Sequence, residues 1–180
     1  MDNTKNITRF EKTAFYFFIY ACLGWILEEI YCIMETHTFT NRGFLFGPLC
    51  PIYGYGALIL IIFFRKYKKN PIKVFFLAAI IFSIFEYITD FFLEALFASR
   101  WWDYTGFFLN LNGRITFSFS IVWGLGSFIF IRFIHPFVTK LLGKILVKVP
   151  FKFQHIFIRI LLSTMFIDTF ISSLVYLNIF

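Results

Sequence analysis

Polar side chains are scarce in this chain, and cysteines are scarcer still. Charged residues occupy 15% of its 180 positions, whereas hydrophobic residues occupy 59%. The three cysteines follow no metal-ligand spacing. The chain also lacks a GxxxxGK[ST] phosphate loop, an HExxH zinc motif and a Ser/His/Asp pattern. We therefore expect no cofactor, no metal site and no catalytic residues, which makes an enzyme the less favoured class.

Long apolar runs fill most of the sequence. A helix needs about 20 apolar residues to cross the hydrocarbon core of a bilayer, and runs of this length do not suit a soluble domain. The pattern predicts an all-α, polytopic membrane helix bundle of about five spans, folded as a single domain over residues 1–180. The predicted spans are Thr13–Met34, Pro51–Phe64, Pro71–Phe97, Ile115–Ile134 and Phe153–Asn178.

Lys and Arg alternate between rich and poor segments along the chain. Nearly all lie before the first apolar run, after the second or after the fourth. Because positive charge beside membrane spans stays in the cytoplasm, we expect the N-terminus inside and the C-terminus outside. This predicts a multi-pass protein of the cell membrane. The cations lie where anionic lipids attract them, so membrane lipids are the expected partners and nucleic acid is not.

Glycine and proline interrupt the second apolar run. Proline removes a backbone donor and blocks the preceding helical turn. The segment 36–50 is therefore predicted to be a folded outer loop, irregular or re-entrant, that leads into a short second span. In the fourth span, the small pair Gly124 and Gly126 predicts close contact with another helix.

A basic segment, Pro136–Val149, separates the last two spans. Lys140, Lys144 and Lys148 recur four residues apart, and apolar residues fill the other faces. This spacing predicts a short amphipathic helix on the inner membrane surface. Lipid contact is the favoured interpretation, and docking of a cytoplasmic partner is the alternative.

Three acids lie along one stripe of the third span. Glu86, Asp90 and Glu94 are four residues apart, so each step drifts by only about 40° around the helix. A carboxylate in hydrocarbon is costly unless it is paired, protonated or hydrated. Two interpretations follow: an outward-opening polar cleft, or a structural network between helices. Asp168, near the middle of the last span, is interpreted as a buried hydrogen-bonding residue between helices.

Other polar residues are predicted to share the outer half of the membrane. Glu28 lies about two turns inside the outer end of the first span. Arg42, Arg100 and Arg114 face a larger number of acids. This surplus would suit a cationic ligand or protons shared between carboxylates. The candidate binding residues are Glu28, Arg42, Glu86, Asp90, Glu94, Asp103, Asn112 and Arg114.

Four motifs carry a family resemblance. They are Gly24-Trp25 with Glu28, the glycine- and proline-rich run 41–54, the triplet 102–104 and the stretch 112–115. Over residues 13–130 the chain resembles the putative type IV ABC-transporter permease family of small bacterial membrane proteins. The resemblance implies a membrane component of a transport system. Since the chain has no phosphate loop, ATP hydrolysis would need a separate ATPase subunit on the cytoplasmic face.

The favoured function is therefore a permease-like subunit with an outward-facing, acid-lined pocket for a small molecule. One alternative is an intramembrane or lipid-processing enzyme that uses paired carboxylates as acid and base. Another is a structural or sensory membrane protein. The lack of a nucleophile or metal set favours transport or binding over catalysis.

Overall fold

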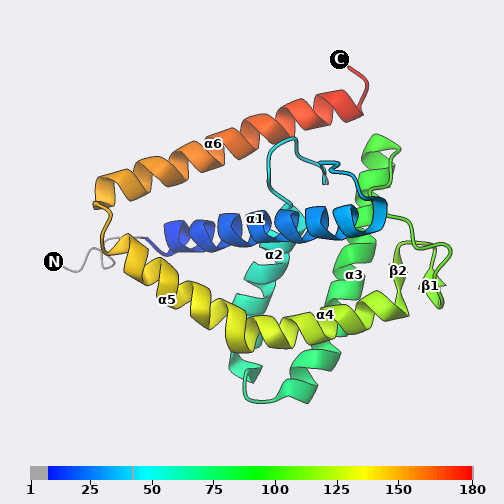
Figure 1. Ribbon diagram of the computed structural model, residues 1–180, viewed down its shortest axis with the longest axis horizontal. Coiled ribbons are helices and arrows are strands. Elements are labelled where there is room, and N and C mark those ends of the chain that lie inside the picture. Colours follow the sequence, from blue (N-terminus) through cyan, green and yellow to red (C-terminus); the bar gives the residue numbers. More distant parts are fainter. Residues whose placement is uncertain (1–7, 42, 180) are drawn as a thin grey trace. The chain divides into compact units, whose positions relative to one another are not determined.

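The computed structural model describes residues 8–41 and 43–179, and helices make up most of it (Figure 1). Four helices are long and apolar enough to cross a membrane. The all-α membrane fold predicted from the sequence is confirmed, and the orientation of the helices in the bilayer stays a prediction. The four helices are α1 (Arg9–Thr36), α3 (Pro71–Phe97), the continuous helix Phe117–Leu146 and α6 (Phe151–Tyr176).

The chain folds as two compact units. The first unit runs to Ile59 and resumes at Val138. It holds α1, α2 (Pro51–Ile59), most of α5 (His135–Leu146) and α6. The second unit holds η2 (Leu60–Phe64), η3 (Arg65–Tyr67), α3, β1 (Asn110–Leu111), β2 (Ile115–Thr116), α4 (Phe117–Ile129) and η4 (Phe130–Ile134). The single domain expected over residues 1–180 stays a prediction.

Local capping signals explain where the long helices begin. Thr8 and Glu11 form a reciprocal capping box at the start of α1, so this helix begins before the predicted Thr13. The Asn70 side chain accepts a hydrogen bond from the backbone N–H of Lys73, and Pro71 occupies the first turn of α3. The third span therefore begins at the residue predicted from the sequence.

The short second helix has the predicted limits. No helix forms between α1 and Pro51 in the described residues, and α2 followed by the π-helical turn η2 then reaches Phe64. The helix formed by α2 and η2 is shorter than each of the four long helices. The segment 36–50 is thus a loop, as its glycines and prolines predicted.

Pro136 does not end the fourth helix, contrary to our expectation of a separate surface helix at Pro136–Val149. The helix continues from α4 through η4 into α5. The backbone N–H of His135 bonds to the carbonyl of Phe130, five residues earlier. This π-helical turn widens the backbone just before Pro136 and accommodates its ring.

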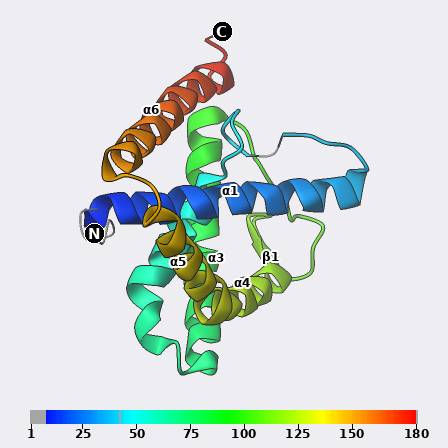
Figure 2. The same cartoon turned by 60° about the vertical axis from the view of Figure 1, so that its left-hand side comes forward.

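A small hairpin joins α3 to α4 within the second unit (Figure 2). Its strands β1 and β2 pair antiparallel, with Leu111 opposite Ile115. The turn contains Asn112 and Gly113, both with positive φ, and a Cβ on Gly113 would lie 2.6 Å from Asp103 Oδ1. Glycine is therefore the residue that fits this position.

Glycines set the closest helix contacts in each unit. In the first unit, a Cβ on Gly24 of α1 would lie 2.3 Å from Cγ of Tyr53 on α2. In the second unit, a Cβ on Gly124 of α4 would lie 2.7 Å from the ring of Phe75 on α3. No atom lies within 4 Å of the corresponding position on Gly126. The predicted small-residue contact is therefore made by Gly124 and not by Gly126, which points elsewhere because it lies about 200° further around the helix.

Candidate functional site

The three acids of α3 meet hydrogen-bond donors from the loop and from α4. Glu86 is the deepest of the three, about 16 Å from the C-terminal end of α3 at 1.5 Å per residue. Its Oε1 accepts a hydrogen bond from the Tyr104 hydroxyl at 3.0 Å. Its Oε2 accepts one from Trp123 Nε1 at 2.8 Å. The carboxyl group is buried and is thus held by two neutral donors.

Two arginines pair with the next two acids of the stripe. Asp90 is fully buried, and its Oδ2 accepts from Arg114 Nη1 and, at 3.2 Å, from Arg100 Nη2. Glu94 accepts from Arg114 Nη2, and Arg100 Nε lies 3.7 Å from its other oxygen. Arg114 therefore bridges two carboxylates one helical turn apart, with its charge above the rings of Tyr87 and Phe91.

The loop before the hairpin adds a fourth acid. Asp103 Oδ1 lies 3.6 Å from Arg100 Nη1 and accepts hydrogen bonds from the hydroxyl and backbone N–H of Thr105. These hydrogen bonds, together with the Arg100 charge, hold the pKa of Asp103 below its ordinary value. Burial acts to lower the pKa of Arg114, but its hydrogen bonds to Glu94 and Asp90 raise it above the ordinary value. Both side chains therefore carry charge at neutral pH.

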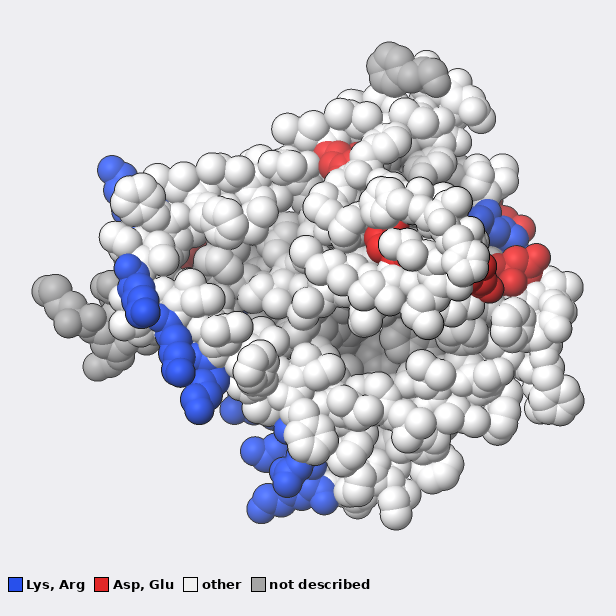
Figure 3. Space-filling model, viewed as in Figure 1, with Lys and Arg blue, Asp and Glu red and all other residues white. Residues whose placement is uncertain are grey.

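We call this group the arginine–carboxylate cluster: Glu86, Asp90, Glu94, Arg100, Asp103 and Arg114. Its acidic and basic atoms lie next to one another near the hairpin (Figure 3). Asn112 belongs beside it, since its backbone carbonyl accepts from Arg100 at 2.8 Å and its side chain donates to the Tyr87 hydroxyl. The cluster has more acids than arginines, as the sequence predicted for this part of the chain.

Two buried atoms of the cluster lack a hydrogen-bond partner among the described residues: Arg100 Nε, which lies 3.7 Å from a Glu94 oxygen, and an oxygen of Asp90. The acceptor of the two is Asp90 Oδ1, on a side chain with no exposed surface. The other oxygen of the same carboxylate has two arginine donors. A buried acceptor without a donor is costly, so this oxygen marks a position where a donor from outside the chain would gain most. No three His, Cys, Asp or Glu side chains among the described residues are arranged to hold a metal ion.

The first unit holds the remaining predicted residues. Glu28 of α1 accepts a hydrogen bond from the Tyr53 hydroxyl of α2 at 2.5 Å. Arg42 lies outside the described residues. The predicted binding role of Glu28 stays a prediction, because its hydrogen bond to Tyr53 joins two neighbouring helices of one unit.

Asp168 of α6 stabilises the loop that precedes α2. Its carboxylate accepts hydrogen bonds from the backbone N–H groups of Phe46 and Gly47, at 3.0 and 2.8 Å, and from the Ser172 hydroxyl. The interpretation of Asp168 as a hydrogen-bonding residue between helices is therefore wrong, because its main partners are backbone amides of the loop. The loop thus reaches about 12 Å along α6 from that helix's C-terminal end.

The same loop also lies against α1. The backbone N–H of Cys50 bonds to the carbonyl of Ala21 at 3.0 Å, about 22 Å from the end of α1 at 1.5 Å per residue. Asn41, near the start of the loop, accepts a hydrogen bond from Trp25 Nε1 of α1 and donates one to the carbonyl of Phe46. Irregular backbone at membrane depth needs such internal partners.

Three residues in or beside the cluster were not among the predicted binding residues. Arg100 was considered only as a counter-ion, although it contacts Asp90, Glu94 and Asp103. Tyr104 belongs to a motif that carried the family resemblance, but nothing in that motif pairs it with Glu86. Trp123 lies in the middle of an apolar span, and its sequence context contains no sign of a buried acid as its partner.

Comparison with known proteins agrees with the resemblance and extends it. The model of the family described as "Putative ABC-transporter type IV" matches residues 15–173. The match therefore includes the last span, which the recognised motifs did not cover. No curated protein and no solved structure matches the chain. Since the family model covers most of its length, this multi-pass membrane protein belongs to the putative type IV ABC-transporter family.

Proposed function

We propose that this chain is the membrane subunit of a transport system in the plasma membrane, and that the arginine–carboxylate cluster is part of its binding site. The bound molecule would be small and would donate hydrogen bonds or carry positive charge. The cluster would face the outside, at the floor of a pocket. The family implies an ATPase partner, and we place that partner on the basic cytoplasmic segments.

The observation that carries this proposal is the buried Asp90 Oδ1 without a hydrogen-bond partner among the described residues. A purely structural pair would gain stability by satisfying both oxygens. The surplus of carboxylates over arginines supports the same chemistry, because it favours a cationic or donating ligand over an anion. Glu86, Asp90 and Glu94 already accept hydrogen bonds from other side chains of the protein. This supports a binding role for these carboxylates over acid–base catalysis.

The orientation can be tested with single cysteines in a variant that lacks the three native ones. Cysteines at Lys69 and Lys144 should react with a membrane-impermeant thiol reagent only from the cytoplasmic side, since basic segments stay inside. A cysteine at Gly106 should react only from outside. Gly106 suits this test because a Cβ there would meet no atom within 4 Å. Labelling of Gly106→Cys from the cytoplasm would refute both the orientation and the outward-facing pocket.

Glu86→Gln is expected to preserve the fold and abolish transport-coupled ATP hydrolysis. The amide oxygen can still accept from Trp123 Nε1, and the amide nitrogen can donate to the Tyr104 hydroxyl, so the shape and hydrogen bonds are retained. The negative charge is lost. We expect the unfolding free energy to change by less than about 1 kcal/mol.

The measurement uses the full chain purified gently with its co-purifying ATPase and reconstituted in nanodiscs. ATP hydrolysis and thermal unfolding are followed on the same samples. Glu35→Gln is the matched control, because Glu35 is exposed at the end of α1 and should leave both readouts unchanged. A stable Glu86→Gln complex with full ATP hydrolysis would remove Glu86 from the site.

A further inference from the structure

An apolar groove lies at the N-terminal end of α3 in the second unit, away from the arginine–carboxylate cluster. Its volume is about 220 Å³, which is below the roughly 300–1,000 Å³ typical of small-molecule pockets. With an apolar lining throughout, it suits part of a hydrocarbon chain and not a polar solute. Its lining residues, from α3 and α4, are Pro71, Ile72, Phe75, Phe76, Leu125 and Phe128.

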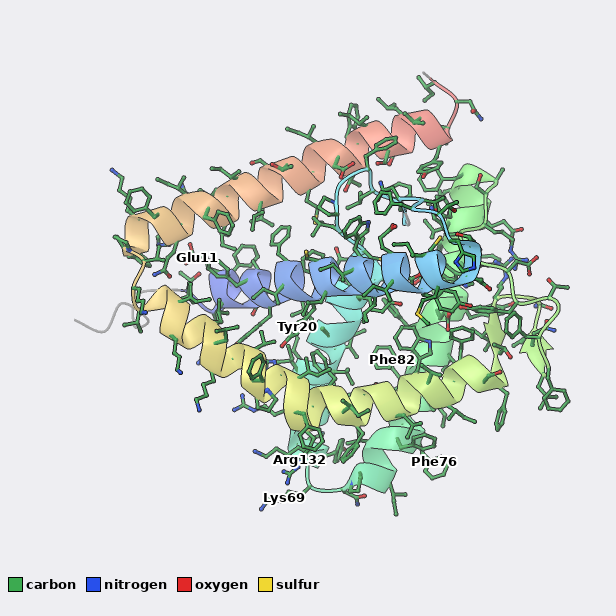
Figure 4. The ribbon with its side chains drawn as sticks, viewed as in Figure 1. Glu11, Tyr20, Lys69, Phe76, Phe82 and Arg132 are labelled. Carbon is green, nitrogen blue, oxygen red and sulfur yellow. The ribbon has the colours of Figure 1, made fainter. Side chains whose placement is uncertain are left out.

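A strongly basic turn leads directly into this groove. No acid occurs anywhere between Leu60 and Phe85. Figure 4 shows Lys69 on the turn and Phe76 further along α3. The cations of this turn are Arg65, Lys66, Lys68, Lys69 and Lys73.

Two of these cations converge on one aromatic ring. Lys66 Nζ lies 5.0 Å from the centre of the Tyr67 ring, and Lys73 Nζ lies 4.4 Å from it. Both lysines are exposed and have no acidic partner among the described residues. Both Nζ atoms lie within 5.0 Å of the same ring centre, so an anion beside this ring would gain attraction from both charges. Lys73 directly follows Ile72, which lines the groove, so the cationic and apolar positions adjoin.

We propose that the groove and the basic turn together bind one anionic phospholipid. Its phosphate contacts Lys66 and Lys73, and part of one acyl chain occupies the groove between α3 and α4. Any membrane lipid can cover an apolar groove, but only an anionic headgroup gains from the two lysines. The site is independent of the transport proposal, because none of its residues belongs to the arginine–carboxylate cluster.

The test measures which lipids remain bound to the purified full-length protein. The protein is equilibrated in detergent with equal amounts of phosphatidylglycerol and phosphatidylcholine, and bound lipids are counted by native mass spectrometry. We expect the wild type to retain phosphatidylglycerol in preference. The double variant Lys66→Gln/Lys73→Gln should lower this preference about tenfold, since each lysine near an anionic headgroup strengthens binding several-fold.

Lys144→Gln/Lys148→Gln removes the same charge elsewhere and should leave the preference unchanged. Leu125→Trp fills the groove and should lower retention of both lipids. If that variant does not fold, Ile72→Trp at a 69% exposed position replaces it.

Three results would overturn the proposal. The first is a wild type without a preference for phosphatidylglycerol, which would favour an acidic protein as the partner of the lysines. The second is an equal effect of the two double variants, which would show that the lipid preference depends only on the overall charge of the protein. The third is unchanged lipid retention in a folded groove-filling variant.

Discussion

Replacing Arg114 with Met is expected to lower the free energy of unfolding by about 3 kcal/mol, because it removes a cation from a buried carboxylate. Arg114 donates to both Asp90 and Glu94, and its side chain is only 12% exposed. Removing one partner of a buried pair typically costs about 3–5 kcal/mol. Arg100 remains 3.2 Å from the same Asp90 oxygen, so the lower end of this range applies. Denaturant unfolding in detergent micelles measures the change.

Two further variants separate the charge effect from side-chain truncation. Arg132→Met makes the same substitution at an exposed position of η4 without an ion pair among the described residues, and it should shift stability by less than about 0.5 kcal/mol. Adding Asp90→Asn to Arg114→Met should restore at least about 1 kcal/mol, since the buried charge is then gone. An Arg114→Met protein as stable as the wild type would contradict the pairing of Arg114 with the buried Asp90.

Gly24→Ala should destabilise the first unit by about 2–3 kcal/mol, through overpacking between α1 and α2. The added Cβ would lie 2.3 Å from Tyr53 Cγ. The Tyr53 ring cannot easily step aside, because its hydroxyl is bonded to Glu28 at 2.5 Å. Alanine favours a helix over glycine by about 1 kcal/mol, so the clash outweighs the gain in propensity. Thermal unfolding in detergent provides the measurement.

Gly126→Ala is the matched control for this prediction. It makes the same change in another apolar helix, where no atom lies within 4 Å of the new Cβ. It should therefore be neutral or stabilising by up to about 1 kcal/mol. If the Gly24→Ala protein is as stable as the Gly126→Ala protein, α1 and α2 are not in the close contact described.

Features encoded locally in the sequence were the most predictable. The apolar runs located all the long helices, and Pro71 marked the start of α3 because proline suits the first turn of a helix. The glycine- and proline-rich segment was correctly predicted as a loop before Pro51. The break expected at Pro136 did not occur, because a π-helical turn can absorb a proline inside a helix, and no residue pattern announced that turn.

The candidate site was only partly predictable for a related reason. Helical periodicity placed Glu86, Asp90 and Glu94 on one stripe, since that spacing depends on α3 alone. Their partners come from other segments: Tyr104 and Trp123 for Glu86, and Arg114 for the other two acids. Periodicity within one helix carries no information about which distant side chain will meet that stripe.

By itself, then, the sequence determined an all-α membrane protein, the approximate positions of its helices and a stripe of acids on α3, because apolar length and helical periodicity act over a few turns of chain. Only the tertiary structure decided which donors hold those acids and that Asp168 binds the loop amides of Phe46 and Gly47, more than a hundred residues away. Such contacts depend on how helices pack, and packing is set by side-chain shape at positions such as Gly24 and Gly124 that adjoin a ring from another helix.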